Sequence, residues 1–128
     1  MDRVCHFEVP YADKDRVTKF YNEVFGWQIS DGPGDMPYSF VITTEVDESF
    51  MPKKTGGING GMYPRGDQVA ASPVVVIEVQ SCEQRIKDVE AAGGVNVMGP
   101  VPVGEMGIYA QVKDSEENII GLWQPLNK

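Results

Sequence analysis

The chain has 128 residues, 41% hydrophobic and 23% charged, a mixture typical of one globular domain and not of a disordered chain. With 11 Lys and Arg against 19 Asp and Glu, the net charge is −8, so we expect no binding to nucleic acid or to an anionic membrane. No apolar run is long enough to span a bilayer, and no signal peptide is visible. Cys5 and Cys82 are too few for a disulfide framework or a zinc site. We therefore expect a cytoplasmic protein.

The first half of the chain predicts a helix among strands. The strands are expected at residues 3–9, 27–29, 38–44 and 56–63. Asp13 or Asp15 caps the helix that follows the first strand, and Gly26 ends it in a left-handed conformation. Apolar residues at helical spacing predict a packed face made of Val17, Phe20, Tyr21, Val24 and Phe25.

The same order then returns in the second half. Its strands are expected at residues 74–79, 95–98, 108–113 and 119–124, with a loop at 99–107. Ser81 and Gln84 form a capping box at the start of the second helix, which ends at Gly93 and Gly94.

Local similarity between the halves indicates an internal duplication. Residues 7–9 match residues 77–79 at an offset of 70, and residues 26–29 match 94–97 at an offset of 68. We predict an α+β fold in which two tandem β-α-β-β-β modules form curved mixed sheets around a cleft. The modules occupy about residues 1–63 and 73–124 of a single domain, 1–128.

Short motifs in both halves point to a known family. They are Phe20-Tyr21-x-x-Val24-Phe25-Gly26-Trp27, Glu90-Ala91-Ala92-Gly93-Gly94 and Asp114-x-Glu116-x-Asn118-x-x-Gly121-Leu122-Trp123. Together with the paired modules they resemble the vicinal oxygen chelate superfamily, which includes glyoxalase I, bleomycin-resistance proteins and extradiol dioxygenases. The resemblance covers about residues 4–124. It implies a ligand cleft and, because superfamily members commonly associate in pairs, a homodimer that also protects edge strands.

The resemblance also implies where a metal would be bound. Enzymes of this superfamily hold one divalent metal with His and Glu from the first and last strands of each module. His6 matches the first of these ligand positions. The other three positions have no donor, since they fall on Val74 (or Val76 by the repeat offset), on Gly60 or Gly61, and on Gly121. A lone histidine is too few ligands for such an ion, so we expect no metal and no resident cofactor.

Strand alternation selects the candidate site residues. His6 and Glu8 share a face and are candidate catalytic groups, with Glu8 as an acid or base. The candidate ligand-binding residues are Asn59, Val74, Val76, Glu78, Ile119 and Trp123. Tyr38, Phe40 and Tyr109 offer further aromatic surface. A purely structural role remains an alternative for every one of them, as packing residues or as charges in solvent at strand ends.

The leading functional hypothesis is a small-molecule-binding protein of the glyoxalase/bleomycin-resistance type that lacks most of the usual metal ligands. The apolar lining suits a hydrophobic or aromatic ligand with one basic or hydrogen-bonding end. Two alternatives stay open. One is a divalent-metal-dependent lyase, isomerase or dioxygenase with non-standard ligands, and the other is a subunit whose main role is protein association.

Overall fold

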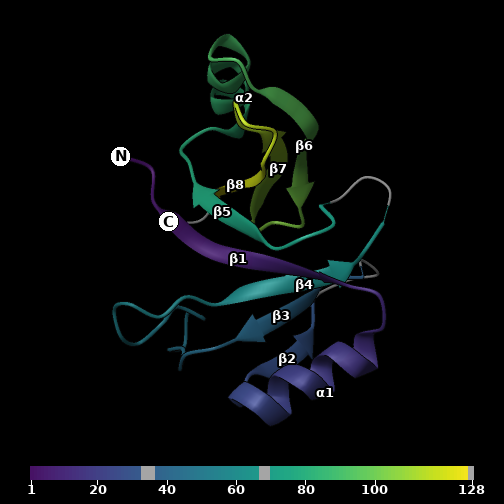
Figure 1. Cartoon of the computed structure of the whole chain (residues 1–128). Coiled ribbons are helices and arrows are strands. Elements are labelled where there is room, and N and C mark those ends of the chain that lie inside the picture. Colours follow the sequence, from purple (N-terminus) through teal and green to yellow (C-terminus); the bar gives the residue numbers. More distant parts are fainter. Residues whose placement is uncertain (33–36, 67–69, 127–128) are drawn as a thin grey trace. The chain divides into compact units, whose positions relative to one another are not determined.

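The computed structural model describes residues 1–32, 37–66 and 70–126. Its elements follow the order β-α-β-β-β twice (Figure 1). The first set is β1 (Val4–Tyr11), α1 (Lys14–Phe25), β2 (Gln28–Asp31), β3 (Ser39–Ile42) and β4 (Gly60–Pro64). The second set is β5 (Val74–Glu78), α2 (Cys82–Ala91), β6 (Val95–Val103), β7 (Gly107–Lys113) and β8 (Ile119–Pro125). The predicted α+β class and its two modules are confirmed.

The chain divides into two compact units. The first unit consists of His6–Pro73, and the second unit consists of the chain from Val74 onward together with Met1–Cys5. The first five residues were expected in the first module, but they lie with the second half. There the Glu78 amide donates to the Arg3 carbonyl at 2.9 Å, and an Arg85–Asp2 ion pair at 2.7 Å adds a side-chain contact.

In the unit His6–Pro73, the strands lie in the order β2-β3-β4-β1. β1 and β4 are parallel, with Glu8 opposite Gly61, whereas the other neighbours are antiparallel. Tyr11, Val41 and Met62 are buried on the face that packs against α1. Alternation along the strands therefore directs His6 and Glu8 to the face away from α1.

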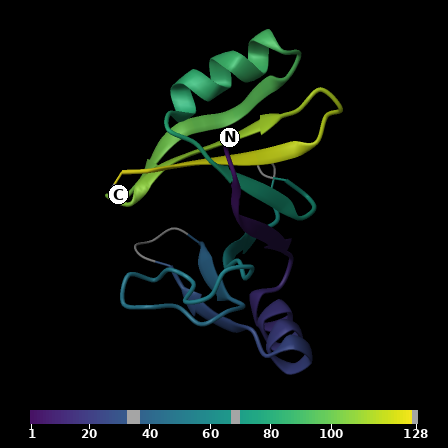
Figure 2. The same ribbon diagram turned by 90° about the vertical axis from the view of Figure 1, so that its left-hand side faces the viewer.

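The second unit repeats this plan, with the strand order β5-β8-β7-β6. β5 and β8 are parallel, with Val76 opposite Gly121. The helix α2 lies along one face of this sheet (Figure 2), where Cys82 and Ile86 are buried with Leu122. The opposite face holds Val76 and Gly121, because they alternate with the core residues. No helix in the described part of the chain is long and apolar enough to cross a membrane.

The helix caps follow the sequence signals closely. The Asp13 side chain accepts a hydrogen bond from the Arg16 amide at 3.0 Å, so Asp13 and not Asp15 is the cap of α1. Gly26 ends α1 with φ 74°, as predicted. Ser81 caps α2 through the Gln84 amide at 3.1 Å. The side chain of Gln84 donates to Asp88 instead of returning to Ser81, which leaves the capping box half formed.

The apolar stripe of α1 is only partly packed, so the predicted packed face is wrong in part. Phe20, Val24 and Phe25 are 52%, 56% and 59% exposed. β2 and β3 have four residues each and offer the helix a narrow surface. Tyr21 packs better than these three residues, because its ring stacks on Trp27 with the ring centroids 4.6 Å apart.

Two strand boundaries also differ from the prediction. The expected loop at 99–107 is largely strand, because register shifts on either side of Met98 let β6 bulge around its glycine and prolines at the sheet edge. Conversely, two strands are shorter than expected: β3 ends at Ile42, two residues early, and β4 begins at Gly60, four residues late. Here the Asn59 side chain, and not a partner strand, accepts the Thr43 and Thr44 amides at 2.7 and 3.0 Å.

We predict that Asp13→Ala lowers the free energy of unfolding by about 1 kcal/mol, because the first turn of α1 loses its cap. Asp15→Ala is the matched control, since it removes a first-turn carboxylate without touching the cap and should cost less than about half as much. Urea denaturation measures both values. Equal losses in the two variants would contradict the cap assignment.

Candidate functional site

A buried carboxylate lies on the face of the first unit that α1 leaves open. Glu8 is 2% exposed, and its Oε2 accepts a hydrogen bond from the Tyr38 hydroxyl at 3.0 Å. Gly61, opposite Glu8 on β4, makes this contact feasible, because a Cβ at that position would overlap the Tyr38 ring. Tyr38 is only partly buried, so the phenol lies between the carboxylate and the surface.

Aromatic rings extend from this hydrogen bond across the same part of the unit. The Tyr38 ring lies 6.0 Å from Phe40 and 6.5 Å from Tyr63, and Phe40 lies 5.5 Å from Phe50. The sequence pointed to Tyr38 and Phe40 but missed Tyr63 and Phe50. Tyr63 could have been found, because it alternates with Gly61 on the same strand.

The face of the second unit that α2 does not cover brings together most of the predicted ligand-binding residues, and two of them, Val74 and Val76, are buried there. On the paired strands β5 and β8, Val76 lies opposite Gly121 and Glu78 lies opposite Trp123, so each pair of residues is a pair of cross-strand neighbours. Alternation adds Val74 and Ile119 to this face. Glu78 forms an ion pair with Arg3 at 3.1 Å. Asn59 is in the other unit, where its side chain holds the backbone of residues 43 and 44.

Gln111 is a polar residue of this face that the sequence did not single out. It is fully buried, and its Nε2 donates to the Tyr109 hydroxyl at 2.9 Å. Gln111 lies opposite Gly121, and a Cβ on Gly121 would be 3.2 Å from the Tyr109 hydroxyl. The two units thus share one arrangement: a glycine on the last strand, a tyrosine hydroxyl against it and a buried polar partner.

These residues do not fit a divalent metal. The last-strand positions at which the resemblance implies a carboxylate are Gly60 or Gly61 and Gly121, and tyrosine side chains occupy the space beside Gly61 and Gly121. Val74 stands at the corresponding first-strand position of the second unit. Among the described residues, no three His, Cys, Asp or Glu side chains gather closely enough to hold an ion. Glu8 and His6 alone would provide fewer ligands than such a metal requires.

His6 shares the open face with Glu8, two residues earlier on β1. Burial lowers the pKa of His6 from 6.5 to about 4, because the charged imidazolium would lose its hydration. At neutral pH the imidazole is therefore uncharged. In that form it can accept a proton or a hydrogen bond, but it adds no positive charge to the face.

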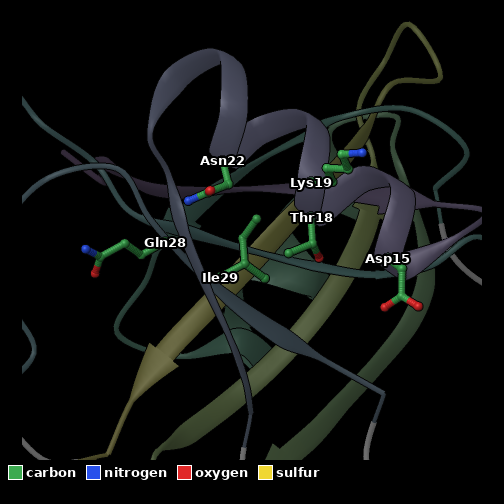
Figure 3. A pocket seen from close by; sticks show the side chains of 6 residues that line it. All are labelled: Asp15, Thr18, Lys19, Asn22, Gln28 and Ile29. Atoms are coloured by element: carbon green, nitrogen blue, oxygen red, sulfur yellow. The ribbon is translucent and has the colours of Figure 1, made fainter.

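A cavity of about 410 Å³ lies on the helix side of the first unit, away from Glu8. Figure 3 shows its lining residues on α1 and β2, which are Asp15, Thr18, Lys19, Asn22, Gln28 and Ile29. The Asn22 amide already donates to the Trp27 carbonyl at 2.9 Å, and Lys19 pairs with Glu23 at 4.0 Å. With these groups partnered, we assign no ligand to this cavity.

We predict that the imidazole of His6 titrates near pH 4, followed as the one histidine resonance in proton NMR. Because this pKa lies below that of an unfolded histidine, the contribution of His6 to stability is complete above about pH 6.5 and is lost between pH 6.5 and 4. The loss should be on the order of 1–3 kcal/mol.

His6→Gln supplies the comparison for this prediction. Asp2, Asp88 and Asp114 also have lowered pKa values, through hydrogen bonds, and weaken the fold in acid in both proteins. The difference between the two unfolding curves therefore isolates His6. A titration midpoint at pH 6 or above would overturn the prediction.

Comparisons with known proteins place the fold. Residues 3–44 match the family model described as bleomycin resistance protein-like N-terminal. The structure is similar to methylmalonyl-CoA epimerase from Mycobacterium tuberculosis, with a TM-score of 0.61 and 13% identity over 94% of this chain and 86% of that one. It is also similar to a glyoxalase/bleomycin resistance protein/dioxygenase superfamily member from Vibrio splendidus 12B01, with a TM-score of 0.58 and 12% identity over 98% and 99% of the chains.

A third similar structure is the Mn(II)-bound glyoxalase from Novosphingobium aromaticivorans, with a TM-score of 0.62 and 14% identity, over 98% of this chain but 38% of that one. A search of curated proteins finds no match. The predicted resemblance is confirmed: the chain has the fold of the vicinal oxygen chelate superfamily, and its first third matches a bleomycin resistance protein-like family model.

Proposed function

We propose that this chain binds small molecules, in the manner of a glyoxalase/bleomycin-resistance-type protein that works without the usual metal. The observation that most supports this is the Tyr38–Glu8 hydrogen bond beside Gly61. The Tyr38 hydroxyl occupies the space that a side chain at Gly61 would need, and Gly61 is one of the two positions at which the resemblance implies a metal-ligand carboxylate. The face therefore offers a ligand an aromatic surface with a fixed hydrogen-bonding group.

The arrangement of Tyr38 favours a ligand with a basic end. Because its hydroxyl donates its proton to Glu8, the Tyr38 oxygen can interact with an N–H group only as an acceptor. In its ionised form, the Glu8 carboxylate strengthens this acceptor. Glu8 itself is almost fully buried, so it is a positioning residue that acts through Tyr38.

The rest of the ligand would lie against aromatic rings. Tyr38, Phe40 and Tyr63 lie close together, and a cation near their faces gains a further attraction from the π systems. A planar or aliphatic body would also bury apolar surface there. The ligand class is thus an organic cation with an apolar body, and the protein would act by sequestering it.

We also propose a cytoplasmic homodimer. Cys5 and Cys82 are thiols, as expected in a reducing compartment. β2 and β6 each lie at one end of the strand order, where an unpaired edge favours association with a second chain.

The alternative function is a divalent-metal-dependent lyase, isomerase or dioxygenase with non-standard ligands. What favours it is the presence of His6 and Glu8 on one strand face, where each is a potential metal ligand. The similar glyoxalase from Novosphingobium aromaticivorans is Mn(II)-bound. A metal titration separates this alternative from metal-free binding.

For ligand binding, we predict that phenylalkylamines bind more tightly than phenylalkyl carboxylates of equal length to the face that contains Tyr38. Tyr38→Phe removes the acceptor oxygen, and Glu8→Gln removes the charge behind it. Each should weaken amine binding by more than about twofold, or roughly 0.4 kcal/mol, measured by calorimetric titration. Trp123→Ala tests in the same way whether the apolar face of the second unit binds a ligand of its own.

Val24→Ala is the control for these variants, since it removes an exposed apolar side chain from α1 on the opposite side of the first unit's sheet. It should leave amine affinity unchanged. Amine binding that neither Tyr38→Phe nor Glu8→Gln weakens would refute the site. So would a preference for carboxylates in NMR shifts at Tyr38 and Phe40.

For metals, we predict that Zn²⁺, Mn²⁺, Ni²⁺ and Fe²⁺ bind no more tightly than at an ordinary surface site, because three of the four superfamily ligand positions have no donor. Elemental analysis of protein purified without a metal-chelating tag, followed by calorimetric titration, measures this. A stoichiometric complex of micromolar affinity that disappears in His6→Ala would instead favour the metal-dependent alternative.

A further inference from the structure

A second cavity, of about 330 Å³, lies beside the start of α1 in the first unit. Its lining residues come from the end of β1, from the beginning of α1 and from the residue after β4, and they are Pro10, Tyr11, Ala12, Asp13, Arg16, Val17, Phe20 and Arg65. β1 and β4 are parallel neighbours, so their carboxyl ends meet at this cavity. The Arg65 amide donates to the Tyr11 carbonyl at 2.6 Å, which fixes the backbone of Arg65 beside β1.

The arginines of this cavity differ from the others in the chain. Arg3 and Arg85, in the other unit, are ion-paired with Glu78 and with Asp2 and Asp88. Within the described residues, neither Arg16 nor Arg65 has a carboxylate at ion-pair distance. Both line the same hollow, so two positive charges share one cavity in a protein with a net charge of −8.

Arg16 is also in an unfavourable place for a cation. It lies in the first turn of α1, where the helix dipole is positive and an anion is favoured. Two other basic residues of this helix, Lys14 and Lys19, are compensated by Asp31 and Glu23. Arg16 thus departs from the helix-dipole rule with no carboxylate at ion-pair distance among the described residues, and such departures are typical of functional positions.

The other lining residues of the cavity indicate which chemical groups the ligand would carry besides its anionic head. Phe20 is 52% exposed and lines the cavity together with Arg16, and Val17 adds further apolar surface. Asp13 brings the one carboxylate among the lining residues, but it is engaged as the cap of α1 through the Arg16 amide. The cavity therefore has two guanidinium groups for an anionic head and an aromatic wall for an apolar body.

We propose that this cavity binds a small organic anion, a carboxylate or a phosphate monoester attached to an aromatic or aliphatic body. Guanidinium groups suit both heads, because their planar forks pair with two oxygens at once. The cavity is distinct from the proposed cation site, because neither Glu8 nor Tyr38 is among its lining residues. The chain would thus hold two ligands of opposite charge on different surfaces of one unit.

Phenyl phosphate and benzoate are the probes, followed by amide NMR shifts in the full chain. We expect saturable shifts at residues 11–20 and 65 with at least one probe, and the tighter probe identifies the head group. Arg16→Gln and Arg65→Gln should each weaken binding by about fivefold or more. Phe20→Ala should weaken binding of both probes but leave the weaker binding of inorganic phosphate unchanged, because inorganic phosphate lacks the ring.

Lys54→Gln is the matched control, since it removes one exposed positive charge from the same unit but not from the cavity. It should change affinity by less than about twofold. All the substituted side chains are exposed, so unchanged melting temperatures would show that the fold is intact. The proposal is overturned if neither probe gives saturable shifts, or if Lys54→Gln weakens binding as much as the arginine variants do.

Discussion

The parallel pairing of the first and last strands in each unit is the constraint on which the candidate site depends. This pairing places Gly61 opposite Glu8 and Gly121 opposite Val76, on the sheet faces that the helices leave open. Glycine lacks a side chain, and a tyrosine from a neighbouring part of the same unit fills the space at both positions. Any larger residue at Gly61 would displace the Tyr38 ring and remove the hydrogen bond that Glu8 accepts.

The duplicated modules keep this geometry while their chemistry differs. In the first unit the tyrosine hydroxyl contacts a carboxylate, and in the second it contacts the neutral amide of Gln111. A buried carboxylate attracts a cation, whereas an amide offers only hydrogen bonds. The first unit is therefore the better place for a charged ligand, and the apolar residues around Trp123 suit the second to an uncharged one.

Charge is distributed unevenly over the first unit. Its open face contains a carboxylate and aromatic rings, while the cavity beside α1 contains two arginines. The exposed Phe20 belongs to that cavity and explains one of the apolar side chains that α1 leaves in solvent. Val24 and Phe25 are also exposed, but they do not line the cavity.

The sequence by itself determined the order of elements, the duplication, the caps at Gly26 and Ser81 and the face shared by His6 and Glu8. These features depend on neighbours along the chain, on helical or strand periodicity and on glycine conformation, all of which are local. Tertiary structure decided the rest. The Tyr38–Glu8 bond joins residues 30 positions apart, and the Gln111–Gly121 pairing joins separate strands. Asn59 ends a strand by bonding to residues 43 and 44. Arg65 and Arg16 line the same cavity because β4 lies beside β1. Such contacts depend on strand pairing and register, which local periodicity does not specify.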